Sequence, residues 1–471
     1  MPLSWRALAL PLLALPLLAP ARPALSQPAA AEPVVRVLLQ QGGELSVRAE
    51  GAVAVRLRDR QGRPLLERSA SQPLLLRLRQ GWVELLAPAV DGSGVPLAQG
   101  LPSTPLAAPE LWIEPVANAV LETGAPAPAL AVGPRRYRGR LQVLAGPEGL
   151  QLINHVPLES YLASVVGSEM PASWPQQALR AQAVAARTYA LKGRRPAAAF
   201  DLQATVASQM YRGLEAETAS TREAVQATRG QVLTYGSALI DAVFHSSSGG
   251  STESSGDLWA QQLPYLVSVP DFDQDSPVRS WRQALDPQLL LKAFPETGGV
   301  SSIEVLSTTA TGRVRQARVL GPAGALVLSG ASLRSRLGIR STWVRFELEL
   351  PPAPVVAIGG GPAFVPPPPA LTLATALPLP AADPAPALPL PQLVAVGRGF
   401  GHGIGMSQWG ALAMARRGDS YPSILSHYYR GTQLRSYGEL AFTAAAEPGS
   451  GSRVLSDGHA QVVATGPVQQ P

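Results

Sequence analysis

Apolar and polar residues alternate through much of the first part of the chain, in short runs that turn residues interrupt. Such runs occupy residues 34–39, 45–49, 54–58 and 74–78, with Gly42, Gly43 and Gly62 between them. Alternation with a period of two, and turn residues at short intervals, are typical of β-strands. We therefore predict a small β-rich module over residues 34–136.

The pattern changes at about residue 137. Residues 137–143 and 150–154 predict a hairpin around Gly146, and a helix follows from Pro157, because proline is favoured at the first helical position. Its apolar residues share one helical face, namely Leu158, Tyr161, Leu162, Val165 and Val166. The helix must end near Met170, since Pro171 disfavours helical backbone in the residue before it.

Two further helices are predicted after this one. The second runs from Pro175 to Leu191 and ends at Gly193, with a stripe of small apolar residues along one face. The third covers residues 218–229 and ends at Gly230, and strands follow at 231–234 and 239–244. Because the stripe on the second helix consists largely of alanine, we expect other helices to approach it closely.

A proline-rich segment interrupts the regular pattern at residues 351–392. Residues 351–391 alone contain 14 prolines, which excludes a packed core and favours extended backbone. Regular structure resumes at Leu393, and residues 443–471 are rich in Ala, Gly, Ser and Pro. We predict an α+β fold in which residues 137–350 and 393–440 form one domain, with a proline-rich linker or insertion and a disordered tail.

Composition excludes several classes of site. The 471 residues include no cysteine, so disulfides, thiolate metal sites and cysteine nucleophiles are absent. The formal net charge is +6, yet no dense basic run occurs, and we predict no nucleic-acid binding. The mild positive charge suits an anionic partner.

The N-terminus has the layout of a secretory signal peptide over residues 1–26. Arg6 precedes an apolar run at residues 7–19, and the small residues Ala24 and Ser26 offer a cleavage site. The run is too short to span a bilayer, and no later apolar stretch reaches about 18 residues. We predict an exported chain without a membrane span once mature; an uncleaved N-terminal anchor is the alternative.

Glu169 and Arg187 are candidates for chemistry within the helical part. Glu169 lies between two predicted helices and close to Trp174; a carboxyl against apolar surface has a raised pKa, which suits a general acid. The alternative is a helix-terminal glutamate in solvent. Arg187 lies among alanines and needs an anion, either a carboxylate of the protein in a structural ion pair or a substrate.

Two loops rich in glycine and hydroxyl groups supply the remaining candidates, and such loops often meet ligands. The first contributes His245, Ser247 and Thr252, and the second contributes His402, Ser407, Gln408 and Trp409. Trp409 offers a flat face on which a sugar can stack. A purely structural role is the alternative for both loops. No HxH, HExxH or P-loop pattern occurs, so we predict no metal and no cofactor; a site shared by His245, His402 and a carboxylate stays open.

The motifs and their order resemble the SpoIID/LytB family. The resemblance rests on VPLESYL at 156–162, SEMP at 168–171, AQAVAARTYA at 181–190, HSSSGG at 245–250, GHGIGMSQWGA at 401–411 and HYY-x-GT at 427–432. It covers about half of the chain and leaves out the β-rich module and the proline-rich segment. A cysteine metal site near the first loop, as in some relatives, cannot form here.

The resemblance implies one of two activities. SpoIID-like members are lytic transglycosylases, which cut MurNAc–GlcNAc bonds of glycan strands without stem peptides and leave 1,6-anhydroMurNAc ends. LytB-like members are amidase enhancers, which bind the cell wall and stimulate an N-acetylmuramoyl-L-alanine amidase without being enzymes. Either activity implies peptidoglycan glycan strands as a partner, a cell-wall amidase as a second, and a place in the periplasm or cell wall.

The resemblance also assigns roles to the candidate residues. The family's catalytic acid falls on Glu169, and Arg187 is expected to orient it or to bind a lactyl carboxylate. His245, Ser247 and Thr252 are expected along one wall of a glycan groove, with His402, Ser407, Gln408 and Trp409 on the opposite wall. One carboxylic acid suffices, because it protonates the glycosidic oxygen and then accepts a proton from the C6 hydroxyl of the sugar, unlike the usual two-carboxylate hydrolase.

Overall fold

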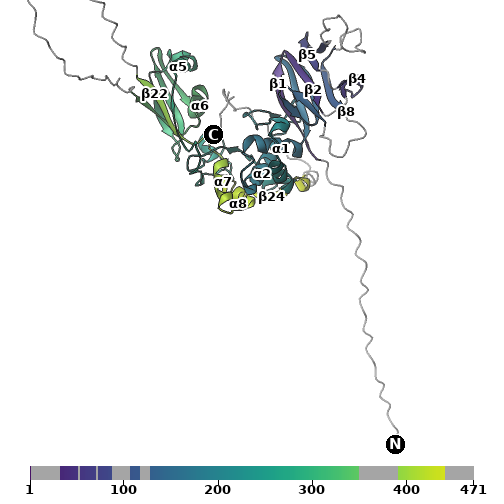
Figure 1. The fold of residues 1–471 in the computed structure, drawn as a ribbon. Coiled ribbons are helices and arrows are strands. Elements are labelled where there is room, and N and C mark those ends of the chain that lie inside the picture. The colour runs from purple at the N-terminus through teal and green to yellow at the C-terminus, as the bar shows by residue number, and fades with distance from the viewer. Residues whose placement is uncertain are drawn as a thin grey trace, which may run out of the picture. The chain divides into compact units, whose positions relative to one another are not determined.

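The computed structural model describes residue 1 and residues 32–50, 54–69, 73–86, 107–116, 128–349 and 391–440. The predicted signal peptide (1–26), proline-rich segment (351–392) and tail (443–471) lie almost wholly outside these ranges. The described residues form helices and several sheets, which confirms the predicted α+β class (Figure 1). Within them, no helix is both long enough and apolar enough to cross a membrane.

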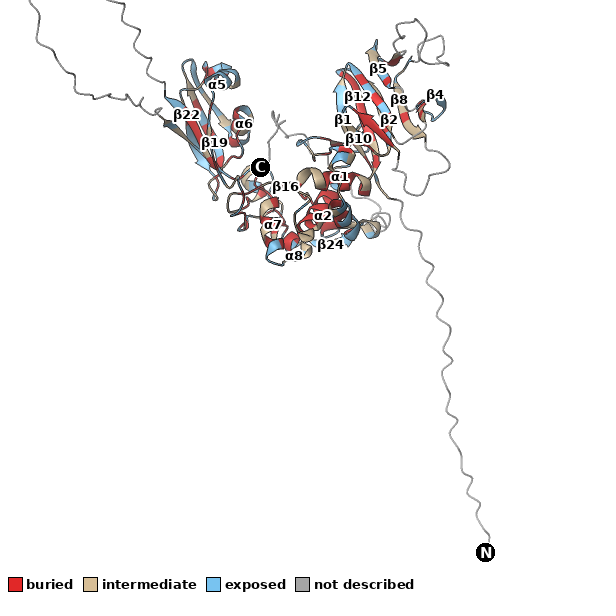
Figure 2. Cartoon of the chain, viewed as in Figure 1, coloured by how far each residue is buried: buried red, intermediate tan, exposed pale blue. Residues whose placement is uncertain are grey.

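Two large antiparallel sheets form a sandwich in the N-terminal part. The first has the order β13-β1-β12-β11-β8-β3-β4, with bounds Leu202–Gln203, Val34–Gly42, Gly149–Pro157, Arg140–Gly146, Glu110–Val116, Ala54–Arg58 and Pro64–Ser69; its one parallel pair is β1 with β13. The second has the order β10-β9-β2-β5-β6-β7, with bounds Arg135–Tyr137, Ala129–Val132, Glu44–Glu50, Leu74–Arg79, Trp82–Leu86 and Ala107–Ala108. Alternate residues such as Val35, Val37, Val55 and Leu57 are fully buried, as the period of two predicts (Figure 2).

The expected boundary at residue 137 falls inside this sandwich. The predicted hairpin is present as β11 and β12, but β12 pairs with β1 (Val35 opposite Val156) and β11 pairs with β8 (Leu141 opposite Ile113). The hairpin therefore belongs to the same sheet as the N-terminal strands and does not open a separate core. Alternation predicts a strand, but it does not say which distant strand will be its neighbour.

A group of helices follows β12 and continues the same hydrophobic core. These helices are α1 (Leu158–Glu169), α2 (Gln176–Lys192), α3 (Ala219–Ala227), α7 (Gln408–Arg416) and α8 (Tyr421–Tyr428), with the 3-10 helix η1 at Gly213–Ala216. The small residues Ala183, Ala186 and Ala190 of α2 are fully buried, and α2 contacts each of the other α-helices in this group. The alanine stripe thus lets neighbouring helices approach, as predicted.

Short strands connect the helices. The strands β14 (Gln231–Tyr235), β15 (Ala238–Leu239) and β24 (Gln433–Ser436) form one small sheet, and β16 (Phe244–His245) pairs in parallel with β23 (Met406–Ser407). A short helix, α4, covers Ser255–Leu258. The predicted strand at 239–244 is therefore split, and only its two ends are in regular β-structure.

A second hydrophobic core lies between residues 280 and 398. Its sheets have the orders β17-β22-β21 (Ser280–Ala284, Gln392–Arg398, Val344–Glu349) and β18-β19-β20 (Ser302–Thr308, Val314–Gly321, Gly324–Ser329), with α5 at Pro287–Ala293, η2 at Pro295–Thr297 and α6 at Gly330–Leu337. Glu349 pairs directly with Gln392. The proline-rich segment therefore leaves β21 and returns into β22 at two strand ends that are already neighbours.

Candidate active site around Glu169

Glu169 is the last residue of α1, and local backbone rules place it there. Met170 has extended backbone (φ −132°, ψ 144°), as expected before Pro171, and its N–H still donates to Val166 O at 2.9 Å. Pro175 then precedes α2 with φ −54°. Residues 170–175 thus form a short corner between two helices, and Glu169 lies at its start.

The carboxylate of Glu169 is partly buried and accepts hydrogen bonds from two distant parts of the chain. Met210 N–H donates to Oε1 at 2.9 Å, and the side-chain amide of Gln408 lies 3.4 Å from Oε2. Burial raises the pKa of Glu169 above its ordinary value, although both hydrogen bonds and the charge of Arg212 oppose the rise. A carboxyl in this state retains its proton to higher pH, which suits a general acid.

The two predicted loops lie side by side. Phe400 and Ser247 exchange backbone hydrogen bonds (3.1 and 2.7 Å), and Glu253 N–H donates to Gly403 O at 2.8 Å. Ser407, at the N-terminus of α7, caps the helix by accepting from Gly410 N–H at 3.2 Å. Gln408 is the first residue of α7, so the cap directs the second loop towards Glu169.

Two tryptophans lie at this corner. Trp174 and Trp409 meet edge to face, with ring centroids 5.2 Å apart and an interplanar angle of 67°, and both are half-buried. The backbone N–H of Trp409 donates to Ser246 O at 3.0 Å, which fixes the position of Trp409 relative to the first loop. The site therefore combines a carboxyl with a raised pKa and partly exposed aromatic surface.

Comparison with known proteins supports a single family. A family model described as "Stage II sporulation protein" (SpoIID) matches residues 147–235, which include α1, Glu169 and α2. This match supports the SpoIID/LytB family for the chain.

The curated relatives agree with this assignment. The chain is 33% identical over 291 residues to "Amidase enhancer" of Bacillus subtilis (strain 168), a match that covers 59% of this chain and 40% of that relative. It is 29% identical over 304 residues to "Stage II sporulation protein D" of the same strain, covering 60% of this chain and 76% of the relative. The protein of that name from Bacillus amyloliquefaciens is also 29% identical, over 302 residues. The chain thus spans less than half of the amidase enhancer.

The expected role of Arg187 is wrong. Its side chain is fully buried and pairs with Glu159, with Nη2 at 2.6 Å from Oε2 and Nε at 2.9 Å from Oε1. Its other donors reach Val225 O and Gln231 O. The geometry is a buried bidentate ion pair that joins α1, α2 and α3, so Arg187 neither touches Glu169 nor is open to a substrate.

Three hydroxyl residues of the SpoIID/LytB loop motifs also need correction. The side chains of Ser247, Thr252 and Ser407 are buried, whereas we expected them to line a groove. Ser247 donates to Asp273, Thr252 accepts from Val269 N–H at 2.8 Å, and Ser407 caps α7. These hydroxyls stabilise the loops through hydrogen bonds inside the protein. The sequence could not predict this, because a hydroxyl-rich sequence does not reveal which way each side chain points.

The two histidines lie together at the junction of the loops, with ring centroids 5.3 Å apart. His402 is partly exposed; its Nδ1 accepts from Ile404 N–H, so its Nε2 donates to Phe244 O at 3.0 Å. His245 is buried, and its Nδ1 lies 3.1 Å from Ile404 O. Burial, and then the nearby His402, lowers the pKa of His245 well below its ordinary value. Throughout the described ranges, no group of three histidines and acids is placed to hold a metal ion.

A buried acidic pair was not singled out in the sequence. Asp271 accepts from Tyr428 OH at 2.6 Å and from the Ser248 hydroxyl, and Asp273 accepts from Gly249 N–H at 2.7 Å. Burial raises the pKa of Asp271, and the neighbouring Asp273 adds to the rise. These acids fix the conformation of the Ser-Gly-Gly turn by accepting hydrogen bonds from Ser248 and Gly249. The only sequence signal was two acids close together in residues 271–273.

A second buried pair links the loops to the core between residues 280 and 398. Glu253 accepts from Thr309 at 2.8 Å and lies 3.8 Å from Arg313. Arg313 in turn donates to Ser248 O at 2.8 Å, and a side chain at Gly403 would collide with its guanidinium. This explains one glycine of the second loop, because only a residue without Cβ lets the backbone lie on the arginine.

Proposed function

We propose that this chain is an exported lytic transglycosylase of the periplasm or cell wall. It would cut MurNAc–GlcNAc bonds in glycan strands that have lost their stem peptides and leave 1,6-anhydroMurNAc ends. The observation that carries the proposal is the state of Glu169, a partly buried carboxyl with a raised pKa that both Met210 and Gln408 hold in place. The similarity to SpoIID supports a role in peptidoglycan.

The proposed reaction uses Glu169 twice. Its proton passes to the oxygen that links C1 of MurNAc to C4 of GlcNAc, and the C1–O bond breaks. The C6 hydroxyl of MurNAc then bonds to C1, and its proton returns to Glu169. No water is consumed, and the acid is restored, so a second carboxylate is not required.

The partners of Glu169 favour both steps. The N–H of Met210 and the amide of Gln408 donate more strongly to the ionised carboxylate than to the neutral carboxyl, so they stabilise the carboxylate left after the first transfer. Burial works in the opposite direction and stabilises the protonated form. The group can therefore give a proton and regain it within one reaction cycle.

The aromatic pair gives the proposal a sugar-binding element. Trp174 and Trp409 are half-buried and come from the two motifs that meet at Glu169. Indole rings present large, flat apolar surface at little cost in conformational entropy, and a pyranose ring packs against such a face. We place the sugar next to the scissile bond against these rings, with His402 at the partly exposed edge of the loops.

A second candidate function has its own support. The relative named "Amidase enhancer" is 33% identical to this chain. Under this alternative the chain binds the cell wall and stimulates an N-acetylmuramoyl-L-alanine amidase, and the surface around Glu169 serves for binding alone. Glu169→Gln, which is nearly isosteric, would then leave the stimulation of the amidase almost unchanged.

Mass spectrometry of digested glycan strands tests the proposal. Native protein, Glu169→Gln and the control Glu223→Gln, an exposed glutamate on α3, are incubated with amidase-stripped strands. We expect new 1,6-anhydroMurNAc ends from the native protein and the control, and a loss of at least roughly 100-fold in Glu169→Gln. Equal activity of Glu169→Gln would contradict the assigned acid. No new ends from folded native protein would favour the amidase enhancer.

A further inference from the structure

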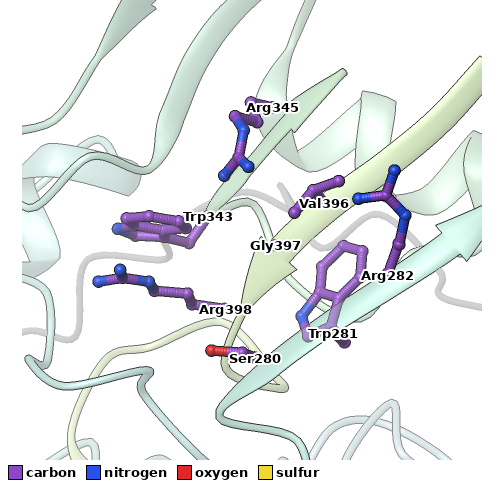
Figure 3. Close-up of a pocket in the computed structure, with 8 residues that line it drawn as sticks. All are labelled: Ser280, Trp281, Arg282, Trp343, Arg345, Val396, Gly397 and Arg398. Carbon is purple, nitrogen blue, oxygen red and sulfur yellow. The ribbon is translucent and has the colours of Figure 1, made fainter. Parts of the chain in front are cut away.

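A basic pocket lined by tryptophan lies on the sheet β17-β22-β21, outside the site around Glu169. Its volume is about 380 Å³. Figure 3 shows the residues that matter for its chemistry, which are Trp281, Trp343, Arg282, Arg345 and Arg398. None of them belongs to the motifs that carry the family resemblance.

Strand register explains why the arginines gather here. On β22, Leu393 and Ala395 point into the core, so Val396 and Arg398 lie on the opposite face. Arg282 of β17 and Arg345 of β21 both pair with Val396, one on each side. Three arginines from three neighbouring strands therefore share one face of the sheet.

Arg398 is the arginine of the pocket that is free to bind an anion. Its guanidinium lies 4.5 Å from the ring centroid of Trp343, and the Trp343 indole is fixed by a 2.7 Å hydrogen bond to Thr311 O. Among the residues that the structure describes, no acid forms an ion pair with Arg398. A guanidinium held over an indole is oriented without being neutralised.

The other two arginines are already paired. Arg345 donates to Glu347 at 2.8 Å, and Arg282 lies 3.3 Å from the same carboxylate and also contacts Glu349. The hydrogen bonds from Arg345 and Arg282 lower the pKa of Glu347, so this carboxylate stays ionised near neutral pH. The three arginines thus face two carboxylates, those of Glu347 and Glu349. Within the described residues, the one positive charge of the cluster that is not neutralised belongs to Arg398.

We propose that this pocket binds the free lactyl carboxylate of a muramic acid residue, with Arg398 on the carboxylate and Trp343 beside the sugar. The inference rests on the proposed function, since it takes the same glycan as ligand. When an amidase removes the stem peptide, each lactyl amide becomes a carboxylate, so a stripped strand is a polyanion. An arginine can pair with both carboxylate oxygens, which a neutral amide cannot reproduce.

The pocket borders the loops of the candidate active site. Arg398 immediately precedes Gly399, whose carbonyl accepts from the Trp281 indole at 2.8 Å. A Cβ at Gly249, in the first loop, would lie 2.8 Å from the Cβ of Arg398. The segment that begins at Arg398 thus runs into the loop that carries Gln408. Selection for stripped strands would then arise beside the catalytic loops and independently of Glu169.

Binding measurements on a defined oligosaccharide test the proposal. The ligand is a GlcNAc–MurNAc hexasaccharide with free lactyl carboxylates, compared with the same hexasaccharide whose carboxylates are converted to methylamides. Calorimetry is carried out on the full chain with Glu169→Gln, which prevents turnover. We expect roughly tenfold tighter binding of the free acid, as for one charge-assisted hydrogen bond. Arg398→Gln should abolish this preference.

Arg318→Gln provides the matched control, because Arg318 is an exposed arginine of β19 that pairs with Glu304, away from the pocket. It should keep the full preference for the free acid. Thermal unfolding of Arg398→Gln, monitored by circular dichroism, verifies that the variant is folded. Equal affinity of the parent for both hexasaccharides, or an undiminished preference in folded Arg398→Gln, would overturn the pocket assignment.

These outcomes are separable from those for the proposed function. A chain that forms anhydro ends through Glu169 but shows no preference for the free acid keeps the function and overturns the pocket. A chain that forms no anhydro ends but loses its preference on Arg398→Gln overturns the transglycosylase and supports the pocket.

Discussion

The side-chain amide of Gln408 lies 3.4 Å from the carboxylate of Glu169, across 239 positions of sequence. This contact joins the start of α7 to the end of α1, and it is where the second glycine-rich loop meets the corner between α1 and α2. Because Gln408 donates to a carboxylate, it opposes the effect of burial on Glu169.

Removing that amide should move the pH profile of the proposed reaction to higher pH. In Gln408→Ala the ionised form of Glu169 loses a donor, so its pKa rises further. Glu169 is then protonated over a wider pH range, and the alkaline limb of the kcat/KM profile moves to higher pH. Rates of anhydro-end formation between pH 4 and 9 provide the measurement. A limb that stays in place or moves downward would show that Gln408 does not influence the acid.

Arg187 should matter for stability and not for chemistry. Arg187→Met leaves Glu159 buried without its partner, and we expect the free energy of unfolding in urea to fall by about 3–5 kcal/mol. The double variant Arg187→Met, Glu159→Met should recover most of this loss, because no unpaired charge remains. A substrate-binding role predicts the reverse: little change in stability, and loss of activity in both variants.

Gly410 should be intolerant of a side chain. A Cβ there would lie 1.9 Å from Asp271 Oδ1 and 2.0 Å from the hydroxyl of Tyr428. Gly410→Ala should therefore lower the free energy of unfolding by about 3 kcal/mol, since α7 or the acid must move. Gly43→Ala, where a Cβ meets nothing within 4 Å, is the control and should change it by less than about 0.5 kcal/mol. Similar losses in both would contradict the contact.

His155 should make the sandwich sensitive to acid. Burial, helped by the charges of Arg140 and Arg36, lowers its pKa to about 4, against roughly 6.5 in the unfolded chain. The folded state resists protonation, so this stabilising contribution is complete above about pH 6.5 and is lost as the pH falls towards 4.

Unfolding in urea at pH 7 and at pH 4.5 measures this effect. His155→Gln should reduce the difference between the two values by up to about 2 kcal/mol, once solvent screening of the partly exposed ring is allowed for. The glutamine amide can still reach Gln142, which now faces the ring nitrogen at 2.9 Å. If the free energy of unfolding falls equally between pH 7 and pH 4.5 in the native protein and in the variant, His155 does not cause the sensitivity to acid.

The helices around Glu169 could be predicted because their limits are local. Pro157 and Pro171 set the two ends of α1, Pro175 sets the start of α2 and Gly193 sets its end, and the observed bounds agree within about one residue of the expected ones. The sequence leaves two settings open for Glu169, an apolar corner or solvent, and the structure gives it a partly buried position where burial raises its pKa. Local backbone rules therefore predict the position of Glu169 at the end of α1.

Partners distant in sequence could not be predicted in the same way. Glu159 lies in the VPLESYL motif, but nothing in an alanine-rich helix identifies which carboxylate an arginine will meet. The hydroxyls of Ser247 and Ser407 were identified by type, yet their orientation depends on the buried Asp271 and Asp273, which come from a segment without regular structure. Similarly, the sequence does not predict that β12 pairs with β1, which lies more than a hundred residues away.

The pairing of Glu349 with Gln392 has a consequence for how this chain can change over time. Because the two strand ends are held together by the sheet, the length of what connects them has little effect on the core below. Each doubling of a flexible connection costs only about 0.6 kcal/mol of closure entropy. The connection between β21 and β22 is thus a position where residues can be gained, lost or replaced by an entire foreign domain, while the sheet that carries Arg398 keeps its register.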